Sequence, residues 1–335
     1  MTKTGNNAVQ ENDRALEELL GQATPRPVPS DEVMRKAKLA VQSDWQHLTR
    51  QRRTQRRLTL LAVAATFVFA IALVMNTVLA PIEQPVQVAT IDKAIGTVYL
   101  LGEQSELNPV IDVDVIRSGE TIKTVRDAHV GLSWGNGGSL RLDENTEVRF
   151  AAADRIELRS GRVYFDSLPD SSLPARLTIE TSQGDVTHVG TQFITAIDDT
   201  SLTVSVREGR VSIDGHYRDA VVNAGKQARL VGSTSPEVLD IKGYGDEWRW
   251  VELTAPVHVT SGQKLTDLLA WFVRETGYKY DFESEDVEAL VKEGDVRGDI
   301  SDTPREALRT SLLVNELDYD IDEENGVILI SQAGR

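Results

Sequence analysis

The sequence of 335 residues contains no cysteine. This absence excludes disulfide bridges, thiolate metal sites, a cysteine nucleophile and a lipid-modified cysteine. The five histidines are scattered, and no two stand at the spacing of metal ligands, so we expect no metal site. The glycine-rich stretch GNGGS (residues 135–139) lacks the Lys-Ser/Thr pair of a phosphate-binding loop, and no serine occupies a nucleophile elbow. The sequence therefore predicts neither a cofactor nor an enzyme that acts on other molecules.

Negative charge outweighs positive charge beyond the first 57 residues. The chain has a net charge of −16, yet residues 1–57 hold 11 Lys/Arg and only 7 Asp/Glu. All of the excess negative charge consequently lies in the remainder. An acidic surface repels phosphates, so we expect no direct contact with nucleic acid and none between this remainder and an anionic membrane surface.

Only one stretch is long and apolar enough to cross a bilayer, residues 58–80 (LTLLAVAATFVFAIALVMNTVLA). Five arginines between positions 50 and 57 precede it, and positive charge at this edge keeps that side of a span in the cytoplasm. A cleaved signal peptide is the alternative, but the preceding segment is too long for its basic region, and the apolar run exceeds the usual length. A buried core helix would show a polar stripe. We expect a single transmembrane helix with residues 1–57 in the cytoplasm.

The cytoplasmic segment is predicted to hold two short helices separated by the PRPVPS stretch. Ser30 caps the second helix, along which an apolar stripe recurs at spacings of three and four. Such short helices cannot bury their stripes alone, so the segment is either a tail that supplies positive charge or a surface for a partner. The partner could be another protein, a second copy of the segment or the membrane surface. On the second interpretation Trp45 is the best single anchor. The stripe residues predicted to bind the partner are Met34, Val41, Trp45 and Leu48.

Residues 85–240 consist of short alternating runs separated by turn residues, which is typical of an all-β domain. Ser160-Gly161 and Glu208-Gly209 are predicted as turns between strands. Strands spaced this closely usually form a barrel, a sandwich or a short solenoid. The fold class predicted for the region outside the membrane is therefore mainly β.

Three segments in this region, LRSGRVYF (residues 158–165), VGTQF (189–193) and VREGRV (206–211), occur in the order found in the FecR family. Over residues 90–232 the chain resembles these bacterial inner-membrane sigma-factor regulators. The resemblance implies a cytoplasmic segment that binds an extracytoplasmic-function sigma factor. It also implies a periplasmic domain that receives a signal from a TonB-dependent outer-membrane transporter or another periplasmic protein.

In some members of this family the bond that corresponds to Gly190–Thr191 is cleaved by the protein itself. The chemistry is plausible here, because a threonine hydroxyl can attack the preceding carbonyl of a strained peptide bond. The alternative is that Gly190 permits a tight bend and Thr191 is an ordinary strand residue. The sequence leaves both interpretations open.

The last region, residues 245–335, is predicted to be a small α+β module. Trp248 and Trp250 would face the same way in an extended linker. Capping boxes at Thr260 and Thr303 predict helices that begin after them, and a strand is expected around VRGDI (residues 296–300). The module resembles the short N-terminal domain of secretins and TonB-dependent transporters, which implies a protein–protein contact. It could equally be a structural cap on the β domain.

The sequence thus predicts four parts, residues 1–57, 58–80, 85–240 and 245–335. We expect a single-pass regulator of the bacterial inner membrane that links a periplasmic signal to an extracytoplasmic-function sigma factor. The alternative is a membrane-anchored periplasmic scaffold without sigma-factor control.

Overall fold

The computed structural model describes residues 17–18, 21, 30–39, 85–102, 107–109, 114–135, 137–167, 177–216, 218–257, 261–297 and 303–334. The chain divides into two units, residues 1–83 and 84–335. The described part of the second unit is mainly β, with few helices, as the sequence predicts. No helix in the described ranges is long and apolar enough to cross a membrane. The predicted span, residues 58–80, lies outside them.

In the first unit, residues 31–39 form a helix whose start agrees with the prediction. The carbonyl of Ser30 accepts the first helical hydrogen bonds, from the backbone N–H groups of Val33 (2.9 Å) and Met34 (3.0 Å). Asp31 and Glu32 stand in its first turn, where negative charge is favourable. The Met34 side chain is exposed.

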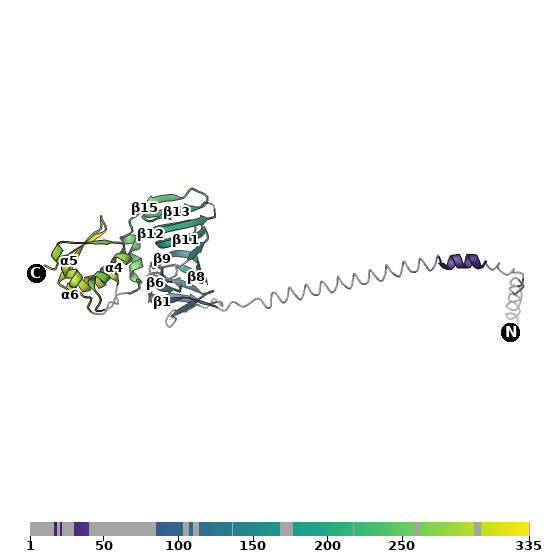
Figure 1. The fold of residues 1–335 in the computed structure, drawn as a ribbon, viewed down its shortest axis with the longest axis horizontal. Coiled ribbons are helices and arrows are strands. Elements are labelled where there is room, and N and C mark those ends of the chain that lie inside the picture. Colours follow the sequence, from purple (N-terminus) through teal and green to yellow (C-terminus); the bar gives the residue numbers. More distant parts are fainter. Residues whose placement is uncertain are drawn as a thin grey trace, which may run out of the picture. The chain divides into compact units, whose positions relative to one another are not determined.

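One network of 15 strands forms the β domain of the second unit, in the order β15-β14-β12-β11-β10-β9-β7-β6-β1-β4, with the remaining strands attached at its side (Figure 1). Its strands are β1 (Gln87–Ile95), β2 (Val98–Leu101), β3 (Leu107–Pro109), β4 (Val115–Arg117), β5 (Thr121–Thr124), β6 (His129–Trp134), β7 (Gly138–Leu142), β8 (Glu147–Ala152), β9 (Arg155–Asp166), β10 (Thr178–Thr181), β11 (Gly184–Ile197), β12 (Ser201–Gly215), β13 (Ala220–Asn223), β14 (Lys226–Val231) and β15 (Glu237–Asp240).

The three longest strands of this sheet change partners part-way along. The first half of β9 pairs with β8 and β10, and its second half pairs with β7 and β11. Likewise β11 passes from β10 to β9, and β12 passes from β14 to β13, while the two stay paired with each other. Each change occurs at a glycine with positive φ: Gly161 (87°), Gly190 (59°) and Gly209 (78°).

The predicted turns at Ser160-Gly161 and Glu208-Gly209 were therefore wrong. These glycines lie inside continuous strands, where they turn the strand through a corner rather than ending it. Across the corner the core-facing residues change from even to odd positions, as from Ile156 and Leu158 to Val163 and Phe165 in β9, and all of them join one apolar core. That core includes Phe150, Phe165 and Phe193, all fully buried.

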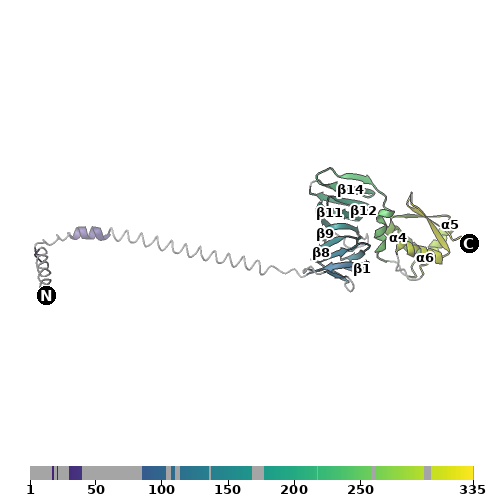
Figure 2. The same ribbon diagram turned by 180° about the vertical axis from the view of Figure 1, so that it is seen from behind.

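The C-terminal module has its own core, centred on Leu268, Phe272 and Leu308. Its three-stranded sheet has the order β16-β18-β17, in which β16 is parallel and β17 antiparallel to β18. In Figures 1 and 2, α4 lies on the side of this module that faces the β domain. Its elements are η1 (Asp246–Trp248), α3 (Arg249–Leu253), α4 (Leu265–Thr276), β16 (Lys279–Phe282), α5 (Glu285–Glu293), α6 (Pro304–Val314), β17 (Leu317–Asp322) and β18 (Val327–Gln332).

Several local predictions for this module need correction. The linker that holds Trp248 and Trp250 is helical rather than extended, so the two indoles do not follow a strand's alternation. Helix α4 begins after Lys264, later than the motif at Thr260 suggested, whereas α6 begins after Thr303 as predicted. Helix α5 was not predicted. Around VRGDI the described part contains only an isolated bridge between Lys264 and Asp295.

The corner of β12 gives a test of the fold. A Cβ atom on Gly209 would overlap the carbonyl oxygen of Gly190 and lie 2.7 Å from Cγ2 of Thr191. Gly225 has nearly the same φ, 76°, but no atom lies within 4 Å of such a Cβ. We expect Gly225→Ala to lower the free energy of unfolding by about 1 kcal/mol, and Gly209→Ala by about 3 kcal/mol, because only Gly209 adds an overlap to the backbone strain. Urea unfolding of the full chain, followed by tryptophan fluorescence, measures both. Equal losses would contradict this account.

Candidate functional site

The C-terminal module rests on the outer face of the sheet, along one row of residues on neighbouring strands. Register pairs Arg141 with Tyr164, Tyr164 with Ile194, and Ile194 with Ser205. Trp248 of η1 packs on this row, with its ring edge-on to Tyr164 at 6.4 Å. The contact surface is a small apolar patch surrounded by charged groups, and we call it the junction.

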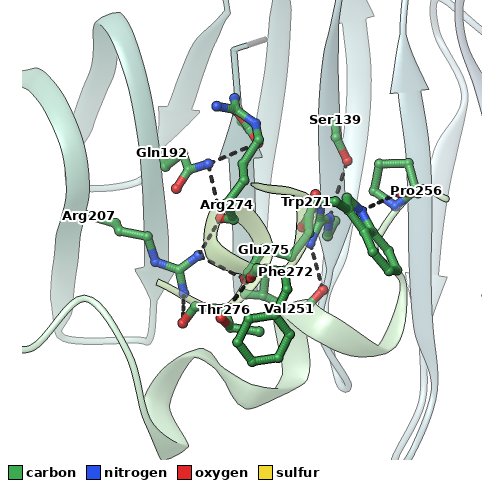
Figure 3. A network of polar contacts seen from close by, with 12 residues as sticks. Ser139, Gln192, Arg207, Val251, Pro256, Trp271, Phe272, Arg274, Glu275 and Thr276 are labelled. Carbon is green, nitrogen blue, oxygen red and sulfur yellow. Dashed lines mark hydrogen bonds and ion pairs between the residues drawn. The ribbon is translucent and has the colours of Figure 1, made fainter. Parts of the chain in front are cut away.

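A buried ion pair forms the centre of the junction. Arg141 of β7 lies 2.6 Å from the carboxylate of Glu275 in α4, and their side chains are 0% and 2% exposed. Arg141 also donates to the carbonyl of Val251 (2.8 Å) and to Oγ of Ser139 (3.2 Å) (Figure 3). Burial opposes the charge on Arg141, but Glu275, together with Tyr164 and Asp166, outweighs this effect and raises the pKa of Arg141.

A second arginine caps the carboxyl end of α4. From β12, Arg207 donates to the carbonyls of Glu275 (3.0 Å) and Thr276 (3.4 Å), and to that of Gly243 (2.6 Å). The last carbonyls of a helix have no partner within it and carry partial negative charge, so a cation is favourable there. Burial lowers the pKa of Arg207.

The same end of α4 also contacts the corner of β9 and β11. Arg274 forms an ion pair with Asp166, the last residue of β9. Nε2 of Gln192 donates to Asp166 (3.1 Å) and to the carbonyl of Arg274 (3.3 Å). Burial raises the pKa of Asp166, although Arg274 acts in the opposite direction. The carboxyl end of α4 therefore holds both Asp166 of β9 and Gln192 of β11.

Inside the module, a further pair ties α3 to α6. Arg305 donates to both carboxylate oxygens of Glu252, at 2.8 and 3.2 Å, in the two-pronged geometry that makes such pairs strong. Burial disfavours the charge on Arg305, but the bonds to Glu252 outweigh this and raise its pKa. The pair fixes α3, which carries Trp250 and directly follows Trp248, to the rest of the module.

The predicted cleavage site lies at the corner of β9 and β11, next to the carboxyl end of α4. Gly190 is exposed, with φ of 59°, at a bulge where the register between β11 and β12 shifts. The bend proposed for Gly190 is thus present. Thr191 is buried, and its Oγ1 has no hydrogen-bond partner among the described residues. Cleavage of the bond stays a prediction.

The predicted partner-binding residues are placed only in part. Met34 lies on the described helix of residues 31–39, exposed to solvent. Val41, Trp45 and Leu48 lie outside the described residues, so their predicted role remains open.

The junction itself was missed by sequence reasoning. Arg141, Arg207 and Glu275 sit among many charged residues, and nothing in their spacing separates them from surface charges. The only usable signal was the pair Trp248 and Trp250, because tryptophans in a polar linker usually need a surface to cover. No group of His, Asp and Glu in the described ranges is arranged to hold a metal ion.

Comparison with known proteins identifies part of the β domain. Residues 120–212, from the start of β5 into β12, match the FecR protein family. This is less than a third of the chain, and it includes all three corner glycines. No curated protein matched the sequence.

Two crystal structures of a candidate anti-sigma factor from Parabacteroides distasonis are also similar. Each is 16% identical and covers 64% of this chain and 99% of that chain, with TM-scores of 0.32 and 0.33. At these TM-scores the likeness does not define a shared fold.

The ion pair between Arg141 and Glu275 can be tested by removing one partner. We expect Glu275→Ala to lower the free energy of unfolding by about 3–5 kcal/mol, because it leaves a buried guanidinium unpaired. Arg141→Met combined with Glu275→Met should restore most of this loss. The exposed pair Lys264–Asp295, 2.7 Å apart, is the control, and Asp295→Ala should cost less than about 1 kcal/mol. Chemical unfolding of the full chain gives the free energy of unfolding of the wild type and of the three variants. Similar losses for the two alanine variants would show that burial gives the Arg141 pair no special role.

Proposed function

We propose that the protein is a single-pass regulator of the bacterial inner membrane that links a periplasmic signal to an extracytoplasmic-function sigma factor. The observation that carries the proposal is the FecR match over residues 120–212, on the carboxyl side of an arginine-flanked apolar run. A FecR domain outside the membrane and a basic helical segment inside it are what such a regulator requires.

Charge distribution supports the orientation. The arginines at 50, 52, 53, 56 and 57 stand immediately before residues 58–80, and lysine and arginine in short flanking segments keep that side in the cytoplasm. The β domain and the C-terminal module would then lie in the periplasm, where a chain without cysteine folds independently of redox conditions.

In the cytoplasm, the partner would bind the apolar stripe of the second helix. That helix has a defined start at Ser30, and Met34 on it is exposed rather than packed within its own unit. An apolar stripe at helical spacing suits a helix-in-groove contact. We assign Met34, Val41, Trp45 and Leu48 to this contact, with the sigma factor as the occupant.

On the periplasmic side, the C-terminal module is the natural receiver of a signal. Its resemblance to the short domain of signalling transporters supports a TonB-dependent outer-membrane transporter, or another periplasmic protein, as its partner. The junction attaches this module to the β domain through ion pairs and a small apolar patch, an interface more polar than a domain core.

The cytoplasmic contact gives the test of this function. Affinity-tagged full-length protein, extracted in detergent from membranes, should co-purify with an extracytoplasmic-function sigma factor encoded beside its gene. Trp45→Ala with Leu48→Ala should reduce the retained sigma factor at least tenfold, because the two large apolar anchors are removed. Ser43→Ala with His47→Ala changes the opposite face of the same predicted helix and should leave retention unchanged. Retention that is insensitive to both pairs would reject the stripe. Absence of any sigma factor would favour the scaffold without sigma-factor control.

We further propose that the Gly190–Thr191 bond cleaves itself. One observation favours this: the buried, unpartnered hydroxyl of Thr191 lies directly after the exposed Gly190. The hydroxyl would attack the carbonyl carbon of Gly190 and form an ester with release of the amine, and water would then hydrolyse the ester.

Substitutions of two threonines on β11 distinguish a loss of the cleavage chemistry from a loss of folding. Freshly made full-length wild-type protein should separate into two fragments that meet at Gly190/Thr191. Thr191→Ala should stay whole, and Thr191→Ser should cleave because it keeps the hydroxyl. Thr195, also buried on β11 with an unpartnered Oγ1 in the described structure, is the control, and Thr195→Ala should cleave like wild type. Denaturing electrophoresis and mass spectrometry read the outcome. A single intact wild-type band would remove the self-cleavage proposal and leave the sigma-factor proposal standing.

A further inference from the structure

Ser167 holds the Thr191 backbone at both of its polar groups. The amide N–H of Thr191 donates to Oγ of Ser167 at 2.7 Å. In return, the carbonyl of Thr191 accepts from the backbone N–H of Ser167 at 3.0 Å, and from its hydroxyl at 3.2 Å. Ser167 comes directly after β9, so this contact extends the pairing of β9 with β11 by one position, with a side chain in place of a backbone acceptor.

The bulge explains why a side chain is needed there. Between Val189 and Gln192 the register of β11 against β12 is interrupted, and the N–H of Thr191 is bound by the Ser167 hydroxyl. This nitrogen is the atom that leaves when the Gly190–Thr191 bond breaks. The hydroxyl therefore lies within hydrogen-bond distance of a reacting atom.

We propose that Ser167 is a catalytic residue of the Gly190–Thr191 cleavage, the group that delivers a proton to the departing amide nitrogen of Thr191. The proposal rests on the self-cleavage proposed above and names the residue that would assist it. An amide nitrogen is a poor leaving group until it is protonated, and a positioned hydroxyl can accept one proton while it donates another.

The reaction balances with water as the only further reactant. Oγ1 of Thr191 forms a bond to the carbonyl carbon of Gly190, and the bond from that carbon to the nitrogen of Thr191 breaks. Ser167 gives its hydroxyl proton to the nitrogen, and a water molecule carries the proton of the attacking Thr191 hydroxyl back to Ser167, which ends unchanged. Water then hydrolyses the ester, which leaves a carboxylate on Gly190 and a free amine and hydroxyl on Thr191. Gly190 is exposed, so water reaches this side of the bond.

Neighbouring contacts fix Ser167 in this place. Asp166, directly before it, is ion-paired with Arg274, and Gln192, directly after Thr191, donates to Asp166. His188 is the competing candidate for proton transfer. However, its Nε2 already accepts from the N–H of Leu177 (3.2 Å), and its ring packs against Phe165, with 4.9 Å between ring centroids. Ser167 alone of these side chains is hydrogen-bonded to the nitrogen of Thr191.

The test compares the rate of fragment formation in full-length variants. Ser167→Ala should slow cleavage about 100-fold, within the usual range for loss of a proton-transfer group. Ser167→Thr keeps a hydroxyl and should restore most of the rate. Ser167→Asn offers an acceptor for the N–H of Thr191 but no hydroxyl, so it should remain slow. Ser160→Ala, at an exposed serine on β9, the strand that Ser167 follows, should match wild type.

Each outcome decides the proposal. Slow Ala and Asn variants together with a fast Thr variant support proton transfer by Ser167. If Asn restores the rate as well as Thr does, Ser167 has only a positioning role and the proposal fails. If Ser167→Ala cleaves at the wild-type rate, the proposal fails while self-cleavage stands. If wild-type protein does not cleave at all, both fail. Near-ultraviolet circular dichroism shows whether each variant is folded.

Discussion

The ion pair between Arg141 and Glu275 is the constraint on which the second unit depends. Both side chains are almost completely buried, 2.6 Å apart, between a strand of the β domain and a helix of the C-terminal module. Desolvation of two charges is offset only when each has a partner, so neither group is stable there alone. The module therefore docks where opposite charges meet. At the carboxyl end of α4, Arg207 contacts backbone carbonyls and Arg274 pairs with Asp166, so charge complementarity acts there as well.

A second constraint is steric and lies at the corner of the sheet. Gly161, Gly190 and Gly209 allow three long strands to change partners without ending, because only glycine takes positive φ at little cost. The corner brings the end of β9 against the bulge of β11, and α4 covers both. The candidate cleavage bond and the junction are consequently adjacent.

Sequence patterns predicted the mainly β class, because alternation of apolar residues has the same period whatever the strand's neighbours are. The helix starts after Ser30 and Thr303 were also predictable, since capping is local. The turns assigned to Ser160-Gly161 and Glu208-Gly209 were wrong for a physical reason. A glycine with positive φ serves a hairpin turn and a strand corner equally well, and only the partners of the flanking residues distinguish them.

The sequence by itself determined where apolar faces would form, where the one apolar run long enough to span a bilayer lies, and that FecR-like segments follow it. Only the tertiary structure decided which charges are buried. Arg141, Asp166 and Glu275 resemble ordinary surface residues in the sequence, because the meeting of residues more than a hundred positions apart has no local pattern. The role of Ser167 has the same origin, since its hydroxyl reaches Thr191, 24 positions away, only where β9 and β11 meet at the corner.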